Sequence, residues 1–268
     1  MRRRLDAELV RRGLVPSREQ ARARIADGRV VVAGAPADKP SRLVAPGEPV
    51  QVLGGPPPFV SRAGAKLAAA LDRFGVDPGG RRALDAGAST GGFTDCLLQR
   101  GAACVVAVDV GWGQLHERLR PDPRVVLHER TNIRTFVLEP PADLVVADLS
   151  FISLRTVAPA LVGTNASAGA DVVVLVKPQF EAGRAEASRG RGVITDPAVW
   201  LRALEGVAAA MGGAGAAMMG AMVSPVPGAD GNVEFLFHLL AHTPTDRATG
   251  GSAPVDLAAV VAEAGGER

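Results

Sequence analysis

The chain has 268 residues, a net charge of +2 and an apolar fraction of 47%. These values fit a globular protein with room for two domains. Its two cysteines, Cys96 and Cys104, are too few for a disulfide framework and fit a reducing cytoplasm. No charged segment followed by an apolar one opens the sequence, so we expect no export signal and a cytoplasmic protein.

Charge is distributed unevenly along the chain. Residues 1–50 hold 11 lysines and arginines against 6 acidic residues, whereas the remainder holds 19 against 22. A basic front segment indicates contact with a polyanion, although a solvated basic face is the alternative. Only three of the 30 basic residues are lysines, namely Lys39, Lys66 and Lys177. A lysine retained among so many arginines suggests a task that requires an amine.

The sequence pattern of residues 1–53 predicts a small α+β domain. Helices are expected at 5–12 and 18–27, because a glycine follows each and Ser17 can cap the second. Short strands are expected at 30–32 and 50–53. On the second helix Ala21 and Ile25 should face inward, and the arginines should face outward: Arg18, Arg22 and Arg24.

The stretch RLDAELVRRGLVPSREQARARIADGRVVVAG, residues 4–34, resembles the RNA-binding fold named after small-subunit ribosomal protein S-four. The resemblance implies that basic side chains of this domain contact RNA phosphates, which position a protein without reading sequence. The candidate RNA-binding residues of this domain are Arg2, Arg4, Arg18, Arg22 and Lys39. Residues 54–60 contain three prolines and are expected to form a stiff linker to a second domain at 61–268.

The second domain alternates short apolar runs with helical segments. Strands are expected at 83–85, 104–110, 125–127, 144–148, 172–176 and 234–240. Helices are expected at 63–74, 93–100, 154–162 and 255–264, the last after a polar spacer at 241–252. This rhythm predicts a doubly wound, mostly parallel, Rossmann-like sheet with helices on both faces.

The stretch 206–223 is uncharged over 18 residues but contains five glycines. We interpret it as a helix end, a glycine loop and a strand start rather than a membrane span. No contact with a membrane is therefore expected.

The stretch LDAGASTGGFT, residues 84–94, combines a strand end, a glycine turn and a helix start. Such a unit binds nucleotide cofactors, because glycines admit a ligand close to the backbone and the helix start offers free N–H groups. The phosphate-binding lysine of a P-loop is missing. The acidic Asp85 favours S-adenosylmethionine, whose amino group pairs with a carboxylate. A tight strand–helix turn is the alternative interpretation.

Polar residues follow the later strands, where doubly wound sheets build their sites. Asp109 is placed to hold a ribose diol, and Asn132 to reach an adenine edge; a turn carboxylate and a loop asparagine are the alternatives. Asp148 and Lys177 end the fourth and fifth strands. A lysine after five apolar residues needs a partner or a task, and a buried Lys–Asp pair is the structural alternative.

Several motifs together resemble the TlyA family of ribosomal RNA 2′-O-methyltransferases, which have an FtsJ-like catalytic domain. In order, they are SRAGAKL at 61–67, LDAGASTGGFT at 84–94, VDVGWGQL at 108–115, ERTNIR at 129–134, DLVVADLSFISL at 143–154, LVKPQFE at 175–181 and GNVEF at 231–235. By position in these motifs the family's Lys-Asp-Lys-Glu tetrad falls on Lys66, Asp148, Lys177 and Glu234.

The resemblance and the glycine turn together give the candidate cofactor-binding residues. They are Asp85, Gly87, Ser89, Thr90, Gly91, Gly92, Phe93, Asp109, Asn132 and Asp148. FtsJ-like enzymes commonly have tryptophan where Phe93 stands and aspartate where Asn132 stands. This departure bears on the adenine contact more than on the fold.

The resemblance implies 2′-O-methylation of cytidine in 16S or 23S ribosomal RNA, with S-adenosylmethionine as donor. Lys177 would act as base or stabilise the developing alkoxide, and Asp148 and Glu234 would hold the two ammonium groups. A target inside helical RNA requires nucleotide flipping, and Phe151 could stack on the displaced base or fill its place; a core phenylalanine is the alternative.

The family also implies sensitivity of the host to capreomycin and viomycin. No Cys/His cluster has metal-ligand spacing, so no metal is expected. A monomer is expected. Two other functions remain open at this stage: a haemolysin, a label some relatives carry, and an RNA-binding module with an inert methyltransferase-like domain.

Overall fold

A computed structural model describes residues 2–15, 17–26, 28–54, 58–183, 186, 192–228, 231–241 and 255–266. The chain forms two compact units, Met1–Pro57 and Pro58–Arg268. This division falls inside the predicted 54–60 linker, of which residues 55–57 lie outside the described ranges. At its far end the linker joins the second unit, because the Val60 N–H donates to Asp95 Oδ2 at 2.8 Å.

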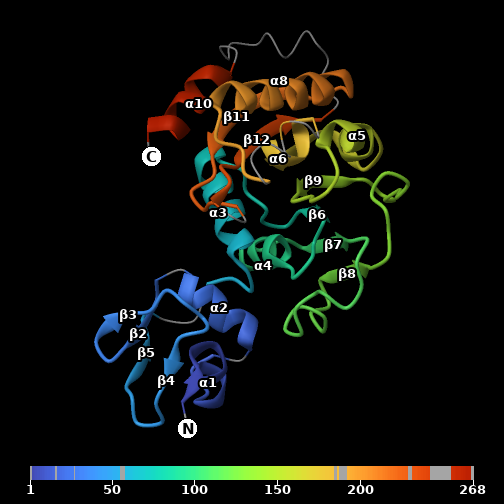
Figure 1. Ribbon diagram of the computed structural model, residues 1–268. Helices are drawn as coiled ribbons and strands as arrows, with labels where there is room; N and C mark the ends of the chain where they lie inside the picture. Colours follow the sequence, from blue (N-terminus) through green and yellow to red (C-terminus); the bar gives the residue numbers. More distant parts are fainter. Residues whose placement is uncertain are drawn as a thin grey trace. The chain divides into compact units, whose positions relative to one another are not determined.

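The amino-terminal unit packs two helices, α1 (Leu5–Arg11) and α2 (Arg18–Ala26), against short strands (Figure 1). The strands β2 (Val30–Val32), β3 (Ala35–Pro36) and β5 (Val50–Val52) form one antiparallel sheet in the order β3-β2-β5. A second antiparallel pair joins β1 (Arg3–Arg4) to β4 (Leu43–Val44). The predicted helices and the two predicted strands are confirmed within a residue or two.

Local signals explain these boundaries. Gly13 and Gly28 take left-handed backbone conformations just after the helices, with φ of 68° and 67°. The Gln20 N–H donates to Ser17 Oγ at 3.2 Å, which is the expected N-cap bond. The prediction that Arg24 faces outward is wrong, because this residue is buried.

The second unit contains a seven-stranded sheet in the part of the chain that the structure describes, in the order β11-β12-β10-β9-β6-β7-β8 (Figure 1). Its strands are β6 (Arg82–Ala86), β7 (Cys104–Val108), β8 (Val125–His128), β9 (Ala142–Ala147), β10 (Ala166–Val176), β11 (Ala217–Val223) and β12 (Phe235–Leu240). The five strands from β8 to β10 are parallel. Strand β12 runs antiparallel to them, and β11, which is antiparallel to β12, runs in their direction again. The Rossmann-like fold is therefore confirmed.

Strand residues alternate between two apolar clusters, one on each face of the sheet. On β10, Val172 and Val174 belong to one cluster, and Val173 belongs to the other. Because both faces are covered, the central strands are continuously apolar, which is why they stand out in the sequence.

Different helices cover the two faces (Figure 1). One face carries α3 (Arg62–Phe74) and α4 (Gly92–Gln99). The other carries α5 (Leu154–Ala158), the π-helical η1 (Pro159–Thr164), α8 (Pro197–Gly213) and α10 (Leu257–Gly266). The predicted helix at 154–162 thus changes its hydrogen-bonding pattern at Pro159, which has no N–H to donate. A short helix, α6 (Pro178–Glu181), follows β10.

The uncharged stretch at 206–223 forms the elements expected of it. Helix α8 ends at Gly213, a glycine turn follows, and β11 begins at Ala217. Among the helices that the structure describes, none is both long and apolar enough to cross a membrane. Most of the predicted 241–252 spacer lies outside the described ranges.

The strand order reverses between β6 and β9. In open α/β sheets ligands bind beyond the carboxyl ends of the strands at such a switch point. The end of β6, where the glycine turn begins, is therefore where the fold places a site.

Candidate functional site

The glycine turn passes under the backbone of the neighbouring strand end. Gly87 has a φ of 84°, and a Cβ placed there would lie 2.6 Å from the carbonyl oxygen of Asp148. Gly91, with a φ of 94°, precedes α4 and takes the N-cap position. Glycine is required at Gly87 both for its backbone conformation and for the close approach of Asp148.

Asp85 lies on β6 below the turn and is fully buried. Its Oδ2 accepts the Thr94 hydroxyl at 2.6 Å, which ties the strand to α4. Burial raises the pKa of Asp85 to about 7; the hydrogen bond from Thr94 opposes the shift and the charge of Asp148 adds to it. Asp85 lines neither pocket described below, so its contact with a cofactor stays a prediction.

Asp109 organises the loop after β7. Its Oδ2 accepts the Ser89 N–H at 2.8 Å, and its Oδ1 accepts the Gly111 N–H at 2.7 Å. The Ser89 hydroxyl also contacts Gln114 Oε1 at 3.1 Å. A carboxylate has about four acceptor positions, so two remain for ribose hydroxyls. The predicted strand 104–110 ends earlier, at Val108, because this turn begins at Asp109.

Two pockets meet at the carboxyl edge of the sheet. The larger, of about 580 Å³, is lined by Asp109 and Asn132 among others. The smaller, of about 150 Å³, is lined by Lys177 together with the glycine turn. The lining residues common to both are Gly87, Ser89, Asp148 and Ser150. The two pockets therefore form one site with Lys177 at one end.

Most of the predicted cofactor residues line one or both of these pockets, but Asp85 and Gly91 line neither. Ser89 and Asp148 line both, Asp109 and Asn132 line the larger, and Thr90, Gly92 and Phe93 line the smaller. The amide oxygen of Asn132 accepts the Arg134 N–H at 3.0 Å, which leaves its NH₂ group as the donor toward a ligand.

The predicted tetrad forms two ion pairs. Lys177 Nζ lies 2.5 Å from Asp148 Oδ1 and 3.0 Å from Ser150 Oγ. Lys66 Nζ lies 2.5 Å from Glu234 Oε2, and both of these residues are buried. Lys177 of one pair and Glu234 of the other lie next to each other by sheet register, because β10 and β12 pair Val176 with Phe235. Lys177 and Glu234 are the next residues beyond that antiparallel pair.

Phe151 lies on the loop between Asp148 and α5 and also lines the larger pocket. Its side chain is 91% exposed, so it is not a core residue. Its ring contacts Phe180 with centroids 5.2 Å apart, and its backbone φ is 65°. A non-glycine residue at positive φ is uncommon and marks a position that the surroundings hold in place.

Sequence reasoning did not single out Ser150 or Gln114. Ser150 follows Asp148 by two residues and contacts the lysine, and Gln114 contacts Ser89. Both lie within the motifs that carry the family resemblance, but only the folded chain shows what they touch.

In the amino-terminal unit, three of the predicted RNA-binding arginines gather around one acid. Arg4, Arg18 and Arg22 lie 3.1, 2.9 and 3.5 Å from the carboxylate of Asp6. Asp6 is fully buried. Burial alone would raise the pKa of Asp6, but the hydrogen bonds from Arg4 and Arg18 outweigh it and hold the pKa well below its ordinary value. Arg2 and Lys39 are exposed.

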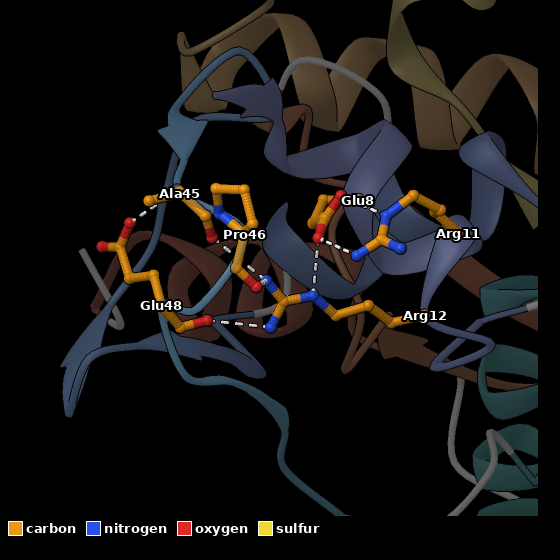
Figure 2. A network of polar contacts seen from close by, with 6 residues as sticks. All are labelled: Glu8, Arg11, Arg12, Ala45, Pro46 and Glu48. Atoms are coloured by element: carbon orange, nitrogen blue, oxygen red, sulfur yellow. Dashed lines mark hydrogen bonds and ion pairs between the residues drawn. The ribbon is translucent and has the colours of Figure 1, made fainter. Parts of the chain in front are cut away.

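Arg12 has a different setting, which Figure 2 shows. Its Nε lies 2.7 Å from Glu8 Oε1, and its Nη atoms donate to the carbonyl oxygens of Ala45, Pro46 and Glu48 at 3.3, 3.2 and 2.8 Å. Arg12 therefore pins a loop to α1, whereas the guanidinium groups around Asp6 stay about half exposed.

Comparisons with known proteins identify the family of each unit. The profile of the FtsJ-like methyltransferase family matches residues 59–240, and that of the S4 domain matches residues 3–50. A 16S/23S rRNA (cytidine-2′-O)-methyltransferase TlyA from Mycobacterium tuberculosis is 52% identical over 92% of each chain. Hemolysin A from Brachyspira hyodysenteriae is 37% identical over 88% of this chain and 99% of its own.

A solved structure of a candidate hemolysin from Streptococcus thermophilus matches 99% of this chain and 96% of its own, with 38% identity and a TM-score of 0.76. The similarity thus extends over both units. The chain belongs to the TlyA family of FtsJ-like methyltransferases and carries an S4 domain at its amino-terminus.

Proposed function

We propose that the protein transfers a methyl group from S-adenosylmethionine to the ribose 2′-hydroxyl of a cytidine in ribosomal RNA. One observation carries the proposal: Lys177, paired with Asp148, lines the same small pocket as the glycine turn. An ammonium is thereby held beside the region where the fold binds a cofactor. The names of the TlyA relatives from Mycobacterium tuberculosis and Campylobacter jejuni supply the substrate class.

The larger pocket fits the proposed cofactor by its chemistry. Its charged lining residues, within the described part of the chain, are Asp109 and Asp148, and no lysine or arginine lines it. Such a lining suits a ligand that carries an ammonium and a sulfonium but no phosphate. Asp109 would hold the ribose hydroxyls, Asn132 would face the adenine, and Asp148 would border the methionine end.

Bound S-adenosylmethionine would supply an electrophilic methyl group on a positively charged sulfur. A ribose hydroxyl is a weak nucleophile at neutral pH, so its proton must leave as its oxygen attacks. In its neutral amine form Lys177 would take that proton. As an ammonium it would instead stabilise the negative charge that develops on the oxygen, and the proton would leave to water. Asp148 and Ser150 fix the position of the Lys177 nitrogen, at 2.5 and 3.0 Å.

Lys66 and Glu234 form a second ion pair at the carboxyl edge of the sheet, and their opposite charges cancel. Their buried pair is self-compensating, since a lone buried ammonium would be strongly destabilising. Glu234 directly precedes Phe235, which pairs with Val176, so by sheet register Glu234 lies beside Lys177 and its pair borders the position of the reacting groups.

Recognition of RNA is assigned to both units. In the amino-terminal unit Arg2, Arg4, Arg18, Arg22 and Lys39 would contact phosphates, and this contact positions the substrate. In the second unit the exposed ring of Phe151 would stack on the flipped cytidine or replace it in the helix.

The proposal extends to the host. The enzyme would act in the cytoplasm on ribosomal subunits, and its methyl groups would assist binding of capreomycin and viomycin. Deleting the gene should then raise resistance to both drugs, and restoring it should lower resistance again. Equal susceptibility with and without the gene would contradict this extension.

Transfer of tritiated methyl groups from S-adenosylmethionine to isolated 30S and 50S subunits tests the core of the proposal. We expect label in ribosomal RNA, and its loss when the target ribose already carries a 2′-O-methyl group. The relative named Hemolysin A gives a second candidate activity. Lysis of red cells by the purified protein without cofactor, together with no labelled RNA, would favour that activity instead.

A further inference from the structure

Glu181, the last residue of α6, reaches across to the start of α5. Its Oε1 accepts the Leu154 N–H at 2.7 Å, and its Oε2 accepts the Ser153 hydroxyl at 2.5 Å. Arg155 also contacts Glu181, because its Nη2 donates to the Glu181 carbonyl oxygen at 2.7 Å. Glu181 is only 5% exposed, so its carboxylate is committed to this junction. It satisfies free donors at the N-terminus of α5.

The two helices joined in this way adjoin the residues of the proposed reaction, Lys177 and Asp148. Helix α6 begins directly after Lys177, and α5 begins after the loop 149–153, which follows Asp148. The same two segments meet again at the pocket, where Lys177 contacts Asp148 and Ser150. The loop is therefore fastened at both ends, by Lys177 near its start and by Glu181 at its finish.

The loop needs such fastening. Phe151 has a φ of 65°, a conformation that a non-glycine residue keeps only when its surroundings hold it. Its exposed ring rests on Phe180, which is the neighbour of Glu181 in α6. Two residues after Phe151, the bonds from Ser153 and Leu154 to Glu181 fix where the chain leaves the loop.

We propose that Glu181 is a positioning residue for methyl transfer, acting through the loop 149–153. It holds Ser150 against Lys177 and presents the ring of Phe151, and it touches neither pocket itself. Glu181 therefore governs the placement of the RNA nucleotide and of the lysine, not the affinity for the cofactor. This inference rests on the proposed function for its activity readout, but the fastening of the loop can be tested separately.

Glu181→Gln is the decisive variant, because it keeps the size of the side chain and removes one acceptor and the charge. Asp196→Asn is the matched control. Asp196 likewise caps a helix of the same unit, since its Oδ1 accepts the Ala198 N–H at 2.9 Å. Asp196 lies at the start of α8 and lines neither pocket. Both variants lose a carboxylate at a helix start, so a general effect on stability appears in both.

Three measurements on the full-length protein separate the possibilities. In single-turnover methyl transfer to ribosomal subunits, we expect Glu181→Gln to slow the reaction by about tenfold to a hundredfold, the scale of a misplaced reacting group. Calorimetry should show an unchanged dissociation constant for S-adenosylmethionine. Hydrogen exchange should show faster exchange at the amides of residues 149–154. Asp196→Asn should change none of these three.

Each contrary result has a distinct meaning. Wild-type exchange rates at residues 149–154 in Glu181→Gln would overturn the fastening of the loop, whether or not the protein methylates RNA. Faster exchange with unchanged transfer would overturn the positioning role. An inactive wild-type protein would instead refute the proposed function. Should Glu181→Gln fail to fold, Ser153→Ala removes one of the same bonds and should give a smaller effect in the same direction.

Discussion

Lys177 and Asp148 directly follow the ends of neighbouring parallel strands, and their side chains meet across the edge of the sheet with Nζ 2.5 Å from Oδ1. Removing either partner would leave the other charge largely buried and unpaired. Breaking a buried pair from one side typically costs about 3–5 kcal/mol. The pair is thus both a structural contact and the group that faces the pocket, and experiments on it must measure folding and chemistry separately.

Gly87→Ala should weaken cofactor binding and stability together. The added methyl group meets the Asp148 carbonyl oxygen, and the backbone φ of 84° is unfavourable for alanine. We expect destabilisation of at least about 2 kcal/mol, seen as a lower melting temperature, and weaker binding of S-adenosylmethionine by calorimetry. Gly113→Ala is the control, since Gly113 has a φ of 73° but open space around its Cβ position. Equal effects of the two substitutions would show that strain alone is responsible.

Asp85→Asn should change how stability depends on pH. The folded-state pKa of Asp85 is raised to about 7 by burial, above the ordinary value of 3.8. The folded state then holds the proton more tightly, so this group stabilises the fold most at acid pH and loses that contribution as pH rises toward 7.

Asp85→Asn has no carboxyl group that titrates at this position, so it does not lose stability in this way as pH rises. Its stability relative to the wild type should therefore improve between pH 5 and pH 8 by at least about 1 kcal/mol, or roughly 2–4 °C in melting temperature. Fluorescence of Trp112 and Trp200 reports this unit alone, because both tryptophans lie in it. A difference that stays constant with pH would refute the raised pKa.

Asp6→Asn should weaken RNA binding although it removes a negative charge. The carboxylate gathers Arg4, Arg18 and Arg22, and the loss of its charge frees them to spread over other positions. Asp38→Asn removes the same charge from an exposed position of the same domain and should bind RNA equally well or slightly more tightly. Filter binding at a fixed salt concentration compares the two. Tighter binding by Asp6→Asn would show that the cluster is not needed.

Glu8 makes the stability of the amino-terminal unit depend on pH in the acid range. Hydrogen bonds from Arg11 and Arg12 lower the pKa of Glu8 from 4.5 to about 2. Its contribution to stability is complete above pH 4.5 and is lost as pH falls toward 2. Glu8→Gln should therefore unfold this unit more readily at pH 6 and differ less from the wild type near pH 2. Circular dichroism can follow the change, with tryptophan fluorescence as the record of the other unit.

The fold was predictable because its physical signals are local. Central strands such as β10 are apolar on both faces, and glycines mark the ends of α1 and α3. Partners across the fold were not predictable in this way. Nothing in the sequence distinguishes Arg12, which pins a loop, from Arg18, which stays half exposed beside Asp6.

In the candidate site, too, some residues were predictable from the sequence and others were not. The glycine turn and the strand-end residues Asp109, Asp148 and Lys177 follow from spacing, because parallel strands end at one edge. Composition singled out Lys66 as one of three lysines, but its pairing with Glu234 came only from the family motifs. The two residues are far apart in the sequence, on a helix and just before an antiparallel strand. The role of Glu181 depends on hydrogen bonds between residues 27 and 28 positions apart in the sequence, which no periodic pattern records.

One measurement tests the central claim most directly: tritiated-methyl transfer to ribosomal subunits by the wild type and by Lys177→Ala, with calorimetry of S-adenosylmethionine on both proteins. The account predicts that the variant still binds the cofactor while transfer falls by at least about 10²-fold. Transfer at the wild-type rate by a folded Lys177→Ala protein would contradict it.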